Sequence, residues 1–372
     1  MVIGIVALAV AMGIGRFAFT PLLPLMLRDG TIDPGIGAEW AAANYVGYLV
    51  GALTAPQMGR QVLRSLRVAL FGVVVSTVLL AFIQAVLPGM ALRFAAGVFS
   101  AWVLVLASTW CLVGLAHHGA GHLGAWIYTG VGIGIALTGV VTWLGGLQPA
   151  WLLWLELGLL AAFGTAYATI TLPQTRDAFA LPSRTKQPGP VRGHMDLVIC
   201  YGAFGFGYIV PATFLPALAR AQVDNPLVFG LTWPLFGIAA AASVAMVARL
   251  HSAVPRSQVW AVAQATMALG TGLPALNHSL WSLTLSAVLV GGTFMIATMA
   301  GLQLARELVP HNPTPLLARM TAAFALGQIA GPVLVRLFEA NAIPGTNATT
   351  LASAVAAVLL AVTAIWLWRA NR

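Results

Sequence analysis

The sequence predicts an all-α membrane protein whose twelve transmembrane helices form two pseudo-symmetric six-helix bundles. Of its 372 residues, 60% are hydrophobic and only 7% are charged, whereas soluble domains carry about a quarter charged residues. Apolar stretches of the ~20 residues that cross a bilayer recur along the whole chain. A repeat of residue types between the first and second halves predicts the two bundles.

Twelve apolar segments follow one another, and most of the connections between them are short, as is typical of neighbouring antiparallel helices. Proline and glycine mark several turns, for example Pro88 and Gly89. Residues 2–15 imitate the apolar part of a signal peptide, but no basic stretch precedes them and the run continues past Arg16 to Leu27, which indicates a retained first span. The expected spans are residues 3–27, 39–58, 68–87, 90–116, 122–146, 149–172, 195–219, 227–250, 258–276, 279–305, 316–339 and 349–369.

The connection over residues 173–193 differs from the others. It is the longest polar segment and contains four prolines and four basic residues. It separates the first six spans from the last six, and its composition predicts a cytoplasmic linker. We therefore expect an N-terminal six-helix bundle over 1–172 and a C-terminal six-helix bundle over 194–372.

The basic residues predict the orientation of the chain. If the N-terminus is cytoplasmic, the outer side holds only Arg28, Arg93, Arg220 and Arg336, and nearly all other basic residues lie on the inner side. Cytoplasmic loops carry the excess of Lys and Arg. We expect both termini to be cytoplasmic, in a cytoplasmic (inner) membrane. The net charge of +9 is thereby explained by topology, and nucleic acid is not an expected partner.

The first span of each half carries the same residue types at the same spacing. A shift of 192 residues places Gly13, Gly15, Pro24 and Arg28 over Gly205, Gly207, Pro216 and Arg220. Related halves of six spans are a recurring plan among transporters.

Three segments resemble the YbfB/YjiJ-like branch of the major facilitator superfamily. They are GIGRFAFTPLLPLM (13–26), NYVGYLVGAL (44–53) and ALGQIAGPVL (325–334). The resemblance covers essentially the whole chain and implies the major facilitator fold and a transport activity, but it names no substrate.

The wider superfamily motifs are partly present. LRFAAG (92–97) is similar to the signature of the fourth span, and GVGIGIALTG (130–139) is similar to the glycine-rich signature of the fifth span, without its usual proline. GRQVLRSLR (59–67), the loop after the second span, keeps the basic residues of the gate motif and lacks its acidic residue.

Arg16 is the most informative single residue because it lies near the middle of the first span. A charge there costs roughly 3 kcal/mol or more unless water or a partner meets it, and Arg does not lose its proton. The resemblance implies that this span lines a central cavity. We expect Arg16 to bind an anionic group of a substrate in a water-accessible chamber. The alternative is a structural Arg bonded to helix carbonyls or to an acidic side chain.

Other polar side chains are candidates for the same substrate site. Arg93 begins a stripe of small and polar residues that continues through Ser100; Arg93 could alternatively snorkel to the headgroups. Tyrosines offer an amphipathic wall with a hydrogen-bonding tip, although packing explains them equally well. The remaining candidates are Thr20, Asn44, Tyr45, Tyr48, Tyr201, Tyr208 and Thr293.

Two carboxylates are candidates for proton coupling. Glu156 lies inside the sixth span, and an intramembrane carboxylate is an obvious proton carrier. The resemblance, however, implies that this span is peripheral, which favours a protonated or locally paired Glu156. Glu39 begins the second span, where a carboxylate also stabilises a helix N-terminus.

Small residues in two spans predict close helix packing or gating. The glycines of the fifth span also imitate part of a nucleotide-binding fingerprint, but they follow no soluble strand. The packing candidates are Gly130, Gly134, Gly139, Gly327, Gly331 and Pro332.

Taken together, these observations predict a secondary transporter of a small organic solute, expected to be anionic, working by alternating access between the halves. The expected partners are this solute, the lipid bilayer and, as an option, protons; we expect a monomer, with no cofactor and no metal. Alternatives are an exporter of amphiphilic or drug-like compounds, a membrane enzyme, which would need clustered catalytic groups, and a non-transporting membrane receptor.

Overall fold

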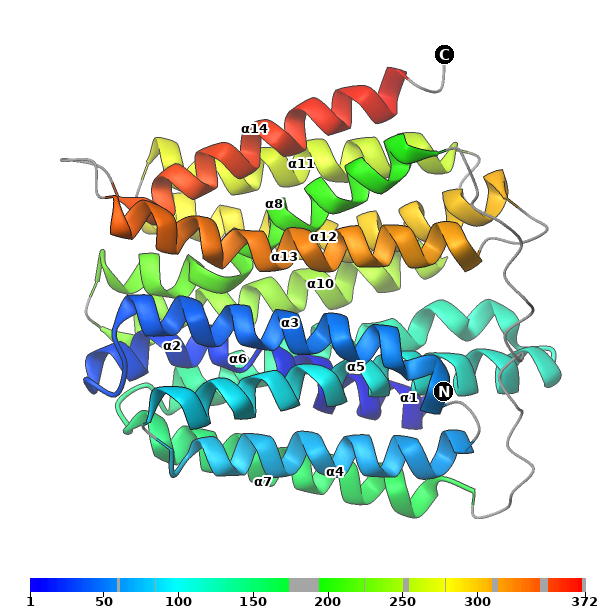
Figure 1. Cartoon of the computed structure of the whole chain (residues 1–372), viewed down its shortest axis with the longest axis horizontal. Helices are drawn as coiled ribbons and strands as arrows, with labels where there is room; N and C mark the ends of the chain where they lie inside the picture. Colours follow the sequence, from blue (N-terminus) through cyan, green and yellow to red (C-terminus); the bar gives the residue numbers. More distant parts are fainter. Residues whose placement is uncertain are drawn as a thin grey trace.

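We analysed a computed structural model of the chain, which describes residues 1–58, 61–83, 85–173, 194–223, 225–249, 254–277, 279–309, 314–341 and 347–369. Within these ranges the regular structure is entirely helical (Figure 1). The all-α class predicted from composition is therefore confirmed. The predicted linker lies outside the described residues, except for Pro173.

The first half of the chain contains the elements that form its first six spans. They are α1 (Val2–Leu8), η1 (Ala9–Arg16), α2 (Phe19–Arg28), α3 (Pro34–Met58), α4 (Val62–Leu80), α5 (Val86–His117), η3 (Gly121–Tyr128), α6 (Thr129–Leu144) and α7 (Ala150–Thr171). The second half contains α8 (Met195–Arg220), α9 (Pro226–Phe229), α10 (Thr232–Arg249), α11 (Arg256–Leu276), α12 (Leu280–Leu308), α13 (Thr314–Ala340) and α14 (Ala348–Arg369).

Ten helical segments in the described ranges are long and apolar enough to cross a membrane, and a shorter apolar helix covers Thr232–Val247. The helix of the second span, α3, has 25 residues but is not one of these ten segments. Its mean hydropathy is lowered by several glycines and by Asn44, Tyr45 and Tyr48. With these two helices included, the segments correspond to the twelve expected spans.

The outward faces of the helices are apolar. Four of their large side chains are between 65% and 85% exposed, namely Phe71, Phe163, Ile170 and Trp281. Large exposed apolar surfaces of this kind mark contact with a membrane or a partner. Together with the helix lengths, they identify an integral membrane protein.

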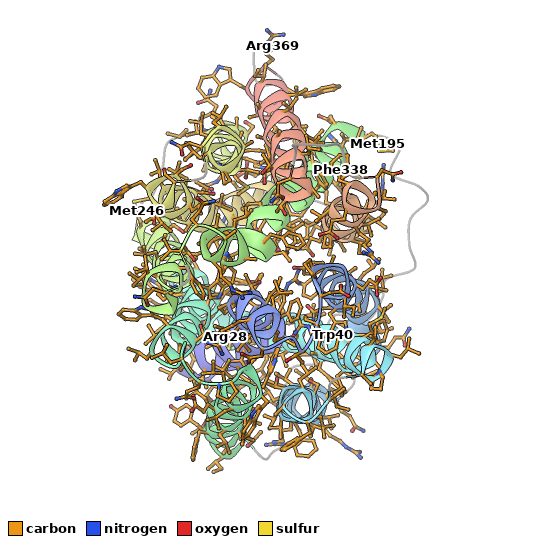
Figure 2. All side chains as sticks on the ribbon, turned by 90° about the vertical axis from the view of Figure 1, so that its left-hand side faces the viewer. Arg28, Trp40, Met195, Met246, Phe338 and Arg369 are labelled. Atoms are coloured by element: carbon orange, nitrogen blue, oxygen red, sulfur yellow. The ribbon has the colours of Figure 1, made fainter. Side chains whose placement is uncertain are left out.

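The helices of each half pack together and form two groups that meet along one interface (Figures 1 and 2). Figure 2 looks along the helices and shows Arg28 and Trp40 in the N-terminal group and Phe338 and Arg369 in the C-terminal group. Across the interface, α6 packs on α10, α3 on α13 and α2 on α8. The start of α1 and the end of α14 lie at the same end of the bundle (Figure 1), as an even number of spans requires.

One pair of the repeated glycines, Gly13 and Gly205, occupies equivalent places in the two halves. A Cβ atom on Gly13 would lie 2.3 Å from the backbone of Gly134 on the fifth span, and one on Gly205 would lie 2.3 Å from the backbone of Phe324 on the eleventh. Only glycine allows such close approach of two helices in a membrane. The repeat seen in the sequence therefore corresponds to a repeated packing contact.

Candidate substrate-binding site

The first span is interrupted where Arg16 lies. The sequence predicts one continuous helix over 3–27, but the chain forms α1, the wider π-helical turns of η1, and a new helix, α2, from Phe19. The amide of Phe17 donates to the carbonyl of Met12, five residues back, at 3.0 Å. Single π-helical turns are frequent at functional sites. The interruption places Arg16 at the last position of η1, directly before the break.

Arg16 is buried at the interface between the two halves, with 2% of its surface exposed. One of its terminal nitrogens donates to Oε1 of Gln328 on α13 at 2.6 Å. The guanidinium carbon lies 3.7 Å from the ring centroid of Tyr48 and 5.4 Å from that of Tyr45, both on α3. Arg16 therefore contacts the second half through a hydrogen bond and its own half through cation–π contacts.

The positive charge of Arg16 has no anionic partner among the described residues. The ion pairs there involve neither Arg16 nor Arg93, and the Nε and Nη1 atoms of Arg16 have no hydrogen-bond acceptor. A buried guanidinium offers five N–H donors, of which the protein engages few. Unpaired buried charges are costly and mark functional positions.

Arg93 braces the interrupted first span. Its terminal nitrogens donate to the carbonyls of Gly15 at 3.2 Å and Arg16 at 3.1 Å, and its guanidinium lies 4.8 Å from the ring centroid of Phe19. Arg93 is 2% exposed, so the snorkelling alternative is wrong. Its visible role is to satisfy carbonyls that the helix break leaves free.

Asn44 and Ser100, two further substrate candidates, bond to backbone carbonyls of their own half. The Asn44 amide donates to the carbonyl of Arg93 at 2.8 Å, and the Ser100 hydroxyl donates to that of Ala11 at 2.7 Å. The Oδ1 atom of Asn44 is buried without a partner. Asn44 therefore joins α3 to α5, and Ser100 fixes the first span against α5.

Thr20 and Tyr45 connect the two halves directly. The Thr20 hydroxyl donates to the carbonyl of Ala212 at 2.9 Å, and the Tyr45 hydroxyl is 2.8 Å from that of Thr213. Ala212 and Thr213 both lie on α8. Three hydrogen bonds, including that of Arg16 to Gln328, therefore cross the interface around the site.

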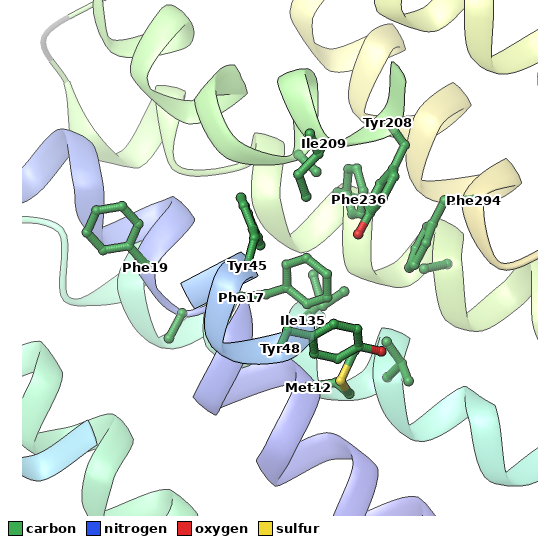
Figure 3. Packing of buried hydrophobic residues seen from close by; sticks show 14 of the residues in the cluster. Met12, Phe17, Phe19, Tyr45, Tyr48, Ile135, Tyr208, Ile209, Phe236 and Phe294 are labelled. Atoms are coloured by element: carbon green, nitrogen blue, oxygen red, sulfur yellow. The ribbon is translucent and has the colours of Figure 1, made fainter. Parts of the chain in front are cut away.

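Tyr208, on α8, lies across the interface from Tyr48, on α3 (Figure 3). Its hydroxyl accepts a short hydrogen bond from the Gln328 amide. Its ring stacks on Phe294 and on Phe324, with centroids 5.6 Å away in each case. Tyr201 lies farther along α8, where its hydroxyl donates to the carbonyl of Thr298 at 3.5 Å. The structure thus brings Tyr208, but not Tyr201, to Arg16.

Three other candidates lie away from Arg16. The Thr293 hydroxyl bonds the carbonyl of Leu289 in its own helix at 2.6 Å. Glu39 is partly exposed and pairs with Arg336 at 3.6 Å. Glu156 lies on α7, which packs on α4 rather than on the interface between halves.

The glycine candidates divide into those that face a helix of their own half and one that faces the other half. Within the N-terminal half, a Cβ on Gly130 or Gly134 would meet the first span; within the C-terminal half, one on Gly327 or Gly331 would meet α8. A Cβ on Gly139 would instead lie 2.5 Å from the amide nitrogen of Pro234 on α10, across the interface. Pro332 lies within α13, between the site and the end that carries Arg336.

The expected water-accessible chamber is not open around Arg16, because both halves close over it in this conformation. A cavity of about 160 Å³ lies elsewhere, at one end of the N-terminal bundle, and Asp29, Trp151 and Trp154 contribute to its lining. Arg16 is, however, bonded to a side chain of the other half rather than to helix carbonyls.

Sequence reasoning missed Gln328 and Thr213, the partners of Arg16 and Tyr45. Gln328 was visible as a polar residue in the apolar eleventh span, which is a signal of the same kind as Arg16. Thr213 carries no such signal, because a threonine in a membrane helix usually bonds its own backbone.

Two related helical bundles that meet at a buried charge are typical of membrane transporters. The chain belongs to the family described as the uncharacterised MFS-type transporter YbfB, whose sequence model matches residues 8–367. The predicted resemblance is confirmed. The family is one of transporters, which excludes the membrane-enzyme alternative.

Solved structures share the fold at low sequence identity. A D-xylose-proton symporter is 12% identical, with a TM-score of 0.77, and the match covers 99% of this chain and 96% of that one. The nucleoside transporter NupG is 15% identical, with a TM-score of 0.72 and coverage of 99% and 97%. The human organic anion transporter MFSD10 is 17% identical, with a TM-score of 0.68 and coverage of 98% of each chain. No curated protein sequence matches the chain.

Proposed function

We propose that this transporter carries a small organic anion across the cytoplasmic membrane by alternating access. The proposal rests on one observation: Arg16 is a permanent, buried charge between the two halves, and no carboxylate pairs with it in the described residues. The N-terminal bundle (1–172) and the C-terminal bundle (194–372) would rock about this point, joined by the linker at 173–193, with both termini cytoplasmic.

The surroundings of Arg16 support an anion with an apolar part. The free Nε and Nη1 donors of Arg16 suit a carboxylate, which forms charge-assisted hydrogen bonds with guanidinium. Tyr48 and Tyr208 supply aromatic surface and hydroxyl groups on opposite walls. An anion held by both walls would contact both halves at once, as a carrier requires.

Energy coupling is a separate part of the proposal. A proton gradient is one source, and exchange of one anion for another is a second. Glu156 and Glu39 lie away from Arg16, so Glu156→Gln and Glu39→Gln should leave anion binding intact. Loss of proton-driven uptake in either variant would assign it the coupling role.

Flux into proteoliposomes tests the proposal. A panel of benzoate, succinate and inorganic phosphate, with the cation choline, is offered to the wild type, to Arg16→Gln and to Arg369→Gln. Arg369 is an exposed residue at the end of α14, so its variant removes the same charge outside the site and outside the gate motif. We expect anion uptake by the wild type and Arg369→Gln and its loss in Arg16→Gln.

The same experiment separates the alternatives. Uptake of choline, or anion uptake that survives Arg16→Gln, would refute an anion site at Arg16. Arg16-independent movement of amphiphilic compounds out of the vesicles would favour the exporter. Binding without flux for every compound would favour a receptor.

A further inference from the structure

We propose that the side chain of Gln328 takes the place of the substrate's anionic group on Arg16, and that the substrate displaces it during transport. This makes Gln328 a positioning and specificity-determining residue that latches the two halves together in the absence of substrate. The inference rests on the proposed anion site at Arg16 and deepens it.

The geometry shows why Gln328 can act as a latch. Gln328 is fully buried on α13 and uses both ends of its amide. Its oxygen accepts from Arg16, in the first half, at 2.6 Å, while its NH₂ group donates to Tyr208, in the second half. The amide therefore joins the charge of one half to the aromatic wall of the other.

The chemistry shows why an anion would replace it. The amide oxygen is a neutral acceptor of one N–H of Arg16, whereas a carboxylate or phosphate carries a full charge and can accept two parallel N–H bonds from one guanidinium. The hydrogen bond from the amide is thus strong enough to satisfy one donor of Arg16 in the empty carrier, and weak enough for the substrate anion to displace it. Once displaced, it leaves the substrate as the connection between the halves.

A glutamate at position 328 would have the opposite effect. It has the same length, but its charge would neutralise Arg16 permanently, and removal of one member of a buried ion pair is strongly unfavourable. The neutral amide is therefore the group that keeps Arg16 available to an incoming anion.

The latch itself can be tested without a ligand. Spin labels at Leu87→Cys and Leu276→Cys, two exposed positions in opposite halves, report the separation of the halves; the buried native cysteines are replaced by alanine. We expect Gln328→Leu to broaden the label–label distances and to add a longer component. The matched control is Gln264→Leu, because Gln264 is equally buried and, in the part of the chain that the structure describes, its amide bonds Thr363 within the C-terminal half and no residue of the N-terminal half.

The displacement step is tested by thermal shift with benzoate, succinate and phosphate. Gln328→Glu should weaken the apparent affinity for any anion that stabilises the wild type by at least tenfold at pH 8, and lower pH should partly restore it as the new carboxylate is protonated. Gln328→Leu should bind that anion as tightly as the wild type or more tightly. Gln264→Leu should change neither.

The outcomes separate a failure of the anion site at Arg16 from a failure of the Gln328 latch. If the wild type binds no anion, or binds one that Arg16→Gln still binds, the anion site itself fails. If wild-type binding depends on Arg16, but both Gln328 variants give wild-type distances and affinities, the anion site stands and the latch is refuted.

Discussion

A close approach between the fifth span and the interrupted first span sets a strong constraint on Gly134. A Cβ atom at Gly134 would lie 2.4 Å from the carbonyl oxygen of Ala9 and 2.7 Å from its Cα, whereas ordinary contact begins near 3.4 Å. The obstacle is backbone, which no side-chain rotation can relieve. In Gly134→Ala the two helices must separate by about 1 Å.

Such overpacking costs ~1–3 kcal/mol, partly offset by the gain of up to ~1 kcal/mol for alanine over glycine in a helix. With a net cost of about 1–2 kcal/mol, we expect Gly134→Ala to lower the apparent melting temperature in detergent by about 2–8 °C, at ~2–4 °C per kcal/mol. The measurement is thermal unfolding monitored by tryptophan fluorescence at a fixed heating rate, because membrane proteins often unfold irreversibly.

Gly114→Ala is the matched control. Gly114 also lies inside a long apolar helix, but a Cβ there has no atom within 4 Å. The same substitution should leave the melting temperature unchanged or raise it. A melting temperature of Gly134→Ala at or above that of the wild type would show that the helices yield freely, and the packing argument would be wrong.

Three further predictions concern contacts between the halves. Gly139→Ala introduces a methyl group against the backbone of α10, so hydrogen exchange should rise in α6 and α10 while η1 stays protected; unchanged exchange would contradict this. Tyr45→Phe removes the hydrogen bond to Thr213, worth about 1 kcal/mol, and should favour the separated halves about fivefold in spin-label distances; an unchanged ratio would count against it. Glu39→Gln removes the partly exposed ion pair with Arg336, so it should lower the free energy of unfolding by less than about 1 kcal/mol. A larger loss in thermal unfolding, or a loss that does not change with salt, would overturn this expectation.

The sequence was sufficient to find Arg16, because a charge in the middle of an apolar span is unusual whatever surrounds it. It also indicated Tyr208 and Tyr45 among the candidates. It did not show that Arg93 serves the carbonyls of the first span, since Gly13, Gly15 and Pro21 mark a weak place in that helix without indicating which side chain meets the freed carbonyls. Gln328 was missed for a related reason, because nothing local connects it to a residue 312 positions away.

Composition and spacing by themselves determined that the chain lies in a membrane, that it is helical, how it divides into spans, and that its two halves repeat one another. These properties follow from local length and polarity, because every peptide group inside a bilayer must be satisfied within a helix. Tertiary structure alone decided which polar side chains meet. Arg16, Gln328 and Tyr208 come from three different spans, and their contact depends on the angle and depth at which two bundles pack, which no single segment encodes.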